Sequence, residues 1–125
     1  MKKLVFAAVS TFAIASASVG HAEDAQAHGY LIGNYKITDQ AVYQQYLDAA
    51  SPLAAKYHGT IIVFNLTSTA LEGQPGPVIA IAEFPTYADV ETFYNSPEYT
   101  EARKLRIAST EGTILMTEGF VPPQQ

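Results

Sequence analysis

The spacing of hydrophobic and polar positions changes along the chain, and each change marks an expected element. Residues 30–37 (YLIGNYKI) are rich in Tyr, Leu and Ile and predict a strand, after which Asp39 can cap a helix. Residues 40–57 predict that helix, because their apolar positions recur every three or four residues along one face. This face comprises Val42, Tyr46, Ala49, Ala50, Leu53 and Tyr57. Pro52 lies inside the pattern, so we expect a kink, or a second short helix that begins there.

The middle of the chain predicts two strands joined by a loop. Gly59 ends the helix, and residues 60–66 (TIIVFNL) form an apolar, β-branched run of strand length. Residues 71–77 (LEGQPGP) predict the loop, since glycine and proline continue neither element. Residues 78–84 (VIAIAEF) are apolar on both alternating faces until Glu83. This pattern is typical of a central strand covered on both sides.

Two helix starts and a final strand complete the pattern. Thr86, with Asp89 three residues later, has capping-box spacing, and Ser96 followed by Pro97 restarts a helix that continues to about residue 109. Residues 113–121 (TILMTEGFV) predict the last strand. The order β-α-β-β-α-β predicts an α+β fold of the ferredoxin-like, split βαβ type. Its helices cover one face of a four-stranded antiparallel sheet.

The other face of this predicted sheet has no helix left to cover it. Its strands are nevertheless apolar on both sides, so something outside the monomer must bury that face. A second copy that packs sheet against sheet is the simplest solution, and we therefore expect a homodimer. Two alternatives stay open: the C-terminal tail, residues 122–125, covers the face, or an oligomer of another geometry does.

The N-terminus has the features of a secretory signal peptide. Met1–Lys3 is basic, and residues 4–17 form an apolar run that is too short for a membrane span of about 20 residues. The small residues that follow predict cleavage after Ala22, with residues 15–17 and 25–27 as alternative small-x-small sites. We therefore expect an exported protein, in the periplasm or the medium, with no membrane attachment after cleavage of residues 1–22.

Cleavage after Ala22 leaves 103 of the 125 residues, enough for one domain with its own core. We expect a short tail over residues 23–28 and the domain over residues 29–121. Loss of Lys2 and Lys3 takes the formal net charge from −5 to −7, which argues against binding to nucleic acid. The chain has no cysteine, so its stability in an oxidising compartment comes from packing rather than disulfides.

Five segments carry a family resemblance: GYLIGNYKITD, YQQYLDAASPLAAKYHG, LEGQPGP, EFPTYADVETFYNSPEYTEARKLR and TILMTEGF. They resemble the family called domain of unknown function 1330, in the dimeric α+β barrel superfamily. The resemblance covers the chain from Gly29 to about Val121 and implies the ferredoxin-like fold and the dimer, but no established activity. One departure is His58, at the end of the first helix, where relatives usually have glycine.

Tyrosines and arginines gather near the second helical region. Tyr99, Arg103 and Arg106 have helical spacing on one face, and Tyr94 precedes them. In one interpretation, the strand-end carboxylate of Glu83 pairs with either arginine, and the tyrosines fill the core. In the other, these two tyrosines and two arginines bind a small carboxylate, phenolate or quinone in a pocket between sheet and helices.

His58 and Glu83 are the candidate catalytic residues, although a histidine at the end of a helix often only satisfies a free carbonyl. Two mature histidines, His28 and His58, and no cysteine provide too few ligands for a metal site. We therefore expect no metal and no cofactor, since haem ligation through a single histidine has little support. No catalytic triad, P-loop or dinucleotide-binding motif occurs.

Three functions remain open. The first is an exported dimer that binds a small aromatic or carboxylate-type molecule. The second is a cofactor-independent monooxygenase or isomerase, as some distant members of the superfamily are. The third is a structural dimer without a ligand, and fold alone does not decide between them.

Overall fold

A computed structural model describes residues 26–125, so the predicted signal peptide and its cleavage site lie outside the described residues. The elements are β1 (Gly29–Ile37), α1 (Gln40–Lys56), β2 (Thr60–Asn65), β3 (Val78–Phe84), α2 (Tyr87–Tyr94), α3 (Pro97–Ser109) and β4 (Thr110–Glu118). Their order confirms the predicted β-α-β-β-α-β sequence, with the second helical segment divided into α2 and α3. None of the described helices is long and apolar enough to cross a membrane.

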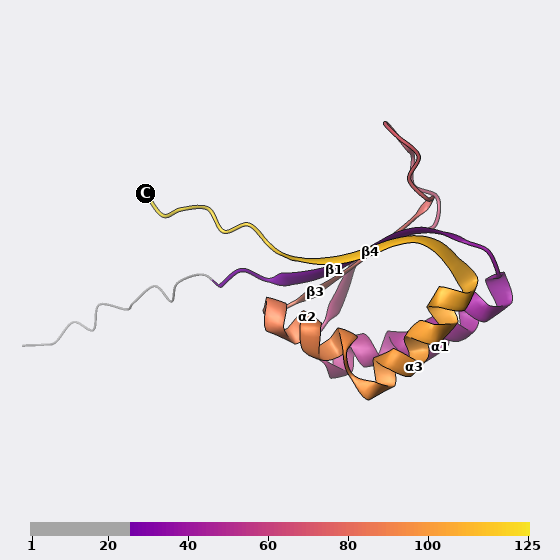
Figure 1. Cartoon of the computed structure of the whole chain (residues 1–125). Coiled ribbons are helices and arrows are strands. Elements are labelled where there is room, and N and C mark those ends of the chain that lie inside the picture. The colour runs from indigo at the N-terminus through magenta and orange to yellow at the C-terminus, as the bar shows by residue number, and fades with distance from the viewer. Residues whose placement is uncertain (1–25) are drawn as a thin grey trace, which may run out of the picture.

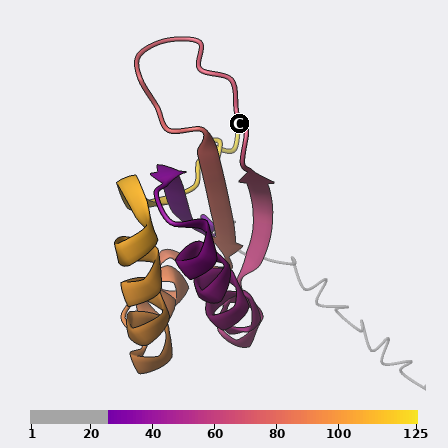
Figure 2. The same ribbon diagram turned by 90° about the vertical axis from the view of Figure 1, so that its right-hand side faces the viewer.

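The four strands form one antiparallel sheet in the order β2-β3-β1-β4, which confirms the predicted ferredoxin-like α+β fold. All three helices lie on one side of this sheet (Figure 1). Helices α1 and α3 run side by side across it (Figure 2). The loop between β2 and β3, residues 66–77, projects beyond the sheet in both views.

The strand register assigns alternate residues to two different faces. Leu31 lies opposite Ala82 of β3 and Met116 of β4, and these three residues pack with the helices in the core. The next residue of β1, Ile32, lies opposite Ile81 and Leu115. Because successive side chains in a strand point to opposite faces, this second row lies on the face away from the helices, which we call the outer face.

Local capping explains where each helix begins. The side chains of Asp39, Thr86 and Ser96 each accept a hydrogen bond from the backbone N–H three residues further on, at 3.1, 3.1 and 3.2 Å. Each of these bonds satisfies a donor in the first turn that has no partner within the helix. All three predicted helix starts are therefore confirmed.

Of the two alternatives at Pro52, the second short helix is wrong, and the predicted bounds of the last strand are wrong as well. Helix α1 continues through Pro52 without a second helix, and the Ser51 hydroxyl donates to the Leu47 carbonyl oxygen at 2.6 Å within that turn. Strand β4 begins at Thr110 and ends at Glu118, three residues earlier at each end than predicted. Its first residues are polar, but their backbone pairs with the end of β1, so pairing rather than hydrophobicity sets where this strand begins.

Candidate ligand-binding site

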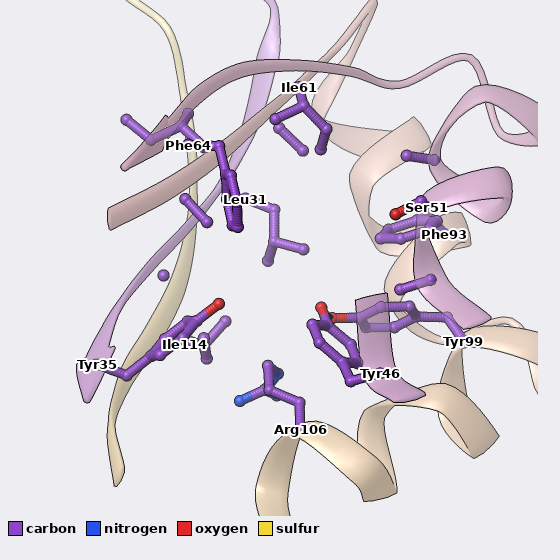
Figure 3. A pocket seen from close by; sticks show the side chains of 16 residues that line it. Leu31, Tyr35, Tyr46, Ser51, Ile61, Phe64, Phe93, Tyr99, Arg106 and Ile114 are labelled. Atoms are coloured by element: carbon purple, nitrogen blue, oxygen red, sulfur yellow. Dashed lines mark hydrogen bonds between the residues drawn. The ribbon is translucent and has the colours of Figure 1, made fainter. Parts of the chain in front are cut away.

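A cavity of about 230 Å³ lies between the sheet and the helices (Figure 3). Most of its sixteen lining residues are apolar, and the polar side chains among them are those of Tyr35, Tyr46, Ser51, Tyr99 and Arg106. Two lining residues of the edge strand β2 are about half exposed, Ile61 at 53% and Phe64 at 47%. Ser51 of α1, also exposed, lines the same side, so the mouth of the cavity lies between α1 and β2.

Small residues at facing positions explain why the interior is hollow here. Gly33 of β1 and Ala80 of β3 are paired neighbours in the sheet, while Ala50 and Ala54 stand opposite on α1. A Cβ atom at Gly33 would lie 2.9 Å from the Tyr35 ring, so a larger residue does not fit there without a shift. Because closely packed interiors leave few voids, this conjunction of small side chains creates a defined space.

Three of the tyrosines that line the cavity, Tyr35, Tyr46 and Tyr99, belong to two hydrogen-bonded pairs of hydroxyls. The Tyr35 and Tyr43 oxygens are 2.8 Å apart, and those of Tyr46 and Tyr99 are 2.9 Å apart. Burial, and then the hydrogen bond with Tyr43, raises the pKa of Tyr35 well above its usual range. Burial, and then the interaction with the neighbouring Tyr99 hydroxyl, raises the pKa of Tyr46 well above its usual range too. Both groups are therefore neutral phenols at neutral pH.

Arg106 is the only residue with a fixed charge among those that line the cavity. It lies in the last turn of α3 and is only 7% exposed. Its Nε atom is buried without a hydrogen-bond partner among residues 26–125, and none of the ion pairs of these residues includes Arg106. Burying a charge without a counter-charge costs free energy, so an anion bound in the cavity would stabilise the Arg106 guanidinium.

The structure brings together two of the four predicted ligand-binding residues. Tyr99 and Arg106 line the cavity, whereas Tyr94 and Arg103 do not. The Arg103 guanidinium lies 4.3 Å from the centroid of the Tyr94 ring in a cation–π contact, and both side chains are half-buried. Arg103 and Arg106 are only three positions apart on α3, yet one lies against an aromatic ring and the other faces the cavity.

The predicted ion pair between Glu83 and an arginine was wrong. Glu83 lies opposite Tyr30 in the register, on the outer face, and its Oε2 atom accepts a hydrogen bond from the Tyr30 hydroxyl at 2.8 Å. The Nδ1 atom of His28 is 3.4 Å from the same oxygen. The Tyr30 hydrogen bond, and then that from His28, lowers the pKa of Glu83. Strand alternation separates Glu83 from both arginines, because its neighbour Phe84 faces the helices.

His58 lies at the C-terminal cap of α1 and is exposed. Its φ angle is 68°, and its N–H donates to the Ala55 carbonyl oxygen at 3.1 Å, while that of Gly59 donates to Ala54 at 2.7 Å. These are the two hydrogen bonds of a Schellman motif, whose left-handed position favours glycine. Neither His58 nor the other catalytic candidate, Glu83, lines the cavity.

Sequence reasoning missed Tyr35 as a site residue and assigned Tyr46 only to the core. The predicted apolar face of α1 is confirmed at Tyr46, Ala50, Leu53 and Tyr57, which pack against the core. It was wrong at Ala49, which is exposed, and it omitted Tyr43 and Ala54, the most buried residues of the helix. The helix is turned so that the Tyr43 hydroxyl meets that of Tyr35 on β1. The available signal was the Tyr43–Tyr46 spacing of three, which puts two hydroxyls that need partners on one helical face.

The arrangement can hold a small molecule and shows no metal centre in the part of the chain that the structure describes. No group of three or more His, Cys, Asp or Glu side chains gathers among residues 26–125. The fold and the site thus define a small α+β protein of the ferredoxin-like class with a cavity between sheet and helices. The chain belongs to the family described as domain of unknown function (DUF1330), whose model matches residues 28–120.

Several solved structures have a similar fold. A protein of unknown function from Rhodopseudomonas palustris aligns with a TM-score of 0.65 and 18% identity, covering 78% of this chain and 85% of that one. A dimeric ferredoxin-like protein of unknown function from Bacteroides fragilis has a TM-score of 0.50 and 19% identity, covering 74% and 95%. SnoaB, a cofactor-independent oxygenase from Streptomyces nogalater, aligns with a TM-score of 0.55 and 10% identity, covering 79% of this chain and 96% of that one. At these identities the likeness shows the fold alone, and no curated protein matches the chain.

Proposed function

We propose that this protein binds a small aromatic or carboxylate-type molecule in the cavity between sheet and helices. One observation carries the proposal: the Arg106 side chain is 7% exposed, lines the cavity, and has an Nε atom without a partner among the described residues. An anionic group on a ligand supplies the missing counter-charge, and guanidinium–carboxylate hydrogen bonds are among the strong ones in proteins.

The size and walls of the cavity support a small ligand. Apolar cavities of about 150 Å³ hold one benzene molecule, and pockets for drug-sized ligands usually measure about 300–1,000 Å³. At about 230 Å³, this cavity falls between the two. Burial of a ligand's apolar surface against these walls supplies the favourable hydrophobic term, and Arg106 fixes which end of the ligand lies deep.

The outer face supports assembly as a homodimer. Ile32, Ile81 and Leu115 form an apolar row across three strands, and Leu115 is 51% exposed. Burial of this row against a second copy removes it from water, and the similar Bacteroides fragilis protein is described as dimeric. The signal-peptide features of residues 1–22 support an exported protein, in the periplasm or the medium.

A cofactor-independent monooxygenase or isomerase is the second candidate, favoured by the donors around the cavity. A guanidinium and phenol hydroxyls can stabilise an oxyanion that forms on a substrate, and SnoaB has a similar fold. The lining residues, however, include no Asp, Glu, His or Lys to abstract a proton. This absence from the cavity wall favours binding over catalysis.

Native mass spectrometry of the protein isolated from its own cells tests the proposal. We expect one acidic small molecule per chain in the wild type and its loss in the Arg106→Met variant. Arg103→Met is the matched control, because it removes the same charge from the same helix outside the cavity, and it should retain the molecule. The protein must not be dialysed or otherwise given the chance to lose a bound molecule before the measurement. Wild-type protein that is ligand-free under these conditions would instead favour a structural dimer.

A further inference from the structure

The polar and apolar groups of the cavity are separated along its length. Figure 3 shows Ile61, Phe64 and Leu31 toward one end and Tyr35, Tyr46 and Arg106 toward the other. The apolar end coincides with the mouth, since Ile61 and Phe64 are its exposed residues. A ligand that enters here therefore places its polar group deep, beside the guanidinium, and its apolar part near the mouth.

The polar end can donate more hydrogen bonds than the protein uses. A guanidinium carries five N–H donors and no acceptor. Each tyrosine pair holds two hydroxyl protons, but only one lies between its two oxygens, so one O–H in each pair is free to donate elsewhere. The positive charge of Arg106 acts on the hydroxyls of Tyr35 and Tyr46, where it opposes the burial that raises the pKa of both groups. Tyr35, Tyr46 and Tyr99 line the cavity, so their hydroxyls and the guanidinium can donate to a ligand at its polar end.

This donor inventory discriminates between ligand headgroups. A carboxylate has two oxygens that only accept, and it cancels the buried charge of Arg106. An amide brings an NH₂ group that meets donors, and it leaves the charge uncompensated. An amidinium adds a second positive charge. The deep end of the cavity thus favours a carboxylate anion over neutral and cationic groups of the same shape.

The walls favour a flat ring behind that headgroup. Five of the lining side chains are aromatic: Tyr35, Tyr46, Phe64, Phe93 and Tyr99. Aromatic rings pack favourably against one another in offset and edge-to-face arrangements, beyond the effect of burial alone. The volume of about 230 Å³ admits one ring with a small substituent, since about 150 Å³ suffices for benzene.

We infer that the ligand is a single-ring aromatic carboxylate, bound as its anion with the carboxylate beside Arg106 and the ring toward the mouth. This inference rests on the proposed binding function and narrows it to one chemical class. It assigns headgroup selectivity to Arg106 and ring selectivity to the aromatic walls.

Four probes of similar size test the inference on refolded wild-type protein, with binding followed by NMR titration. Benzoate, benzamide and benzamidine share one ring and differ in charge, while cyclohexanecarboxylate keeps the charge and loses the flat ring. We expect benzoate to bind at least about tenfold more tightly than benzamide, and benzamidine not to bind. Cyclohexanecarboxylate should bind about threefold or more weakly than benzoate.

The outcomes separate the two proposals. If benzamide or benzamidine binds as tightly as benzoate, the carboxylate class is wrong but the binding function stands. Equal binding of cyclohexanecarboxylate overturns the aromatic part alone. If none of the four probes binds at millimolar concentration, both proposals fall. In Arg106→Met, checked for folding by circular dichroism, the preference for benzoate over benzamide should vanish, whereas Arg103→Met should keep it. Equal losses in the two variants would overturn the assignment to Arg106.

Discussion

Replacing Arg106 by Met should stabilise the ligand-free protein, which is the opposite of the usual result at a buried position. The side chain is 7% exposed, and its Nε atom has no partner among the described residues. A buried donor without a partner costs about 1–3 kcal/mol. Methionine keeps much of the apolar stem and removes both the donor and the charge. We therefore expect the free energy of unfolding to rise by about 1–2 kcal/mol, and Tm by about 4–16 °C for a domain of this size.

Urea unfolding followed by far-UV circular dichroism measures this change, since the chain has no tryptophan to report by fluorescence. Bound small molecules must first be removed by unfolding and refolding, because any ligand stabilises the wild type alone. Protomer concentration must be equal in all samples, since unfolding of a dimer depends on it.

Arg103→Met is the matched control on the same helix. It removes the same charge but also a cation–π contact with Tyr94, worth about 0.5–1 kcal/mol. This variant should therefore be slightly less stable than the wild type, while Arg106→Met is more stable. A loss of about 3–5 kcal/mol in Arg106→Met, as for a broken buried ion pair, would refute the reasoning, because Arg106 would then have a structural counter-charge.

Four further predictions follow from other parts of the molecule. Leu115→Lys on the outer face should give monomers in light scattering, whereas Ile107→Lys, at an exposed position on α3, should leave dimers; dimers in both would refute the interface. His58→Gly should raise the free energy of unfolding by roughly 1 kcal/mol or less, because glycine adopts the left-handed cap without strain; a loss would contradict this. The ionised Glu83 stabilises the fold above its ordinary pKa of 4.5, and this stability is lost as the pH falls through its lowered folded-state pKa. The urea midpoint of Glu83→Gln should therefore depend less on pH below 4.5 than that of the wild type. An unchanged pH dependence in this range would count against the Tyr30 hydrogen bond. N-terminal sequencing of exported material should begin at Glu23, and retained Met1 would exclude cleavage.

The elements were predictable where the signals are local. The caps at Asp39, Thr86 and Ser96 depend on residues within one turn, and each was found where the sequence indicated. The polar start of β4 was not predictable in this way, because Thr110 joins the strand only through its pairing with Ile37. Local chemistry thus determines helix starts, whereas strand ends depend on a partner far away in the sequence.

Glu83 shows why the candidate site was only partly predictable. Strand β3 is apolar at both alternating sets of positions, so its sequence does not reveal which set faces the helices. The structure shows that Phe84 does, and Glu83 consequently lies on the outer face. The cavity was less predictable still, since it depends on Gly33, Ala80 and Ala50 meeting from three separate elements. Arg106 was identified from its spacing with Tyr99, which α3 preserves.

The central claim is that Arg106 holds an anion that the chain itself does not supply. A crystal structure of the mature protein isolated from its source, at a resolution that resolves small molecules, tests this claim most directly. We predict a small molecule in the cavity, with a carboxylate within hydrogen-bonding distance of the Arg106 guanidinium. A guanidinium paired instead with a carboxylate of the partner subunit, in a cavity that contains only water, would contradict the account.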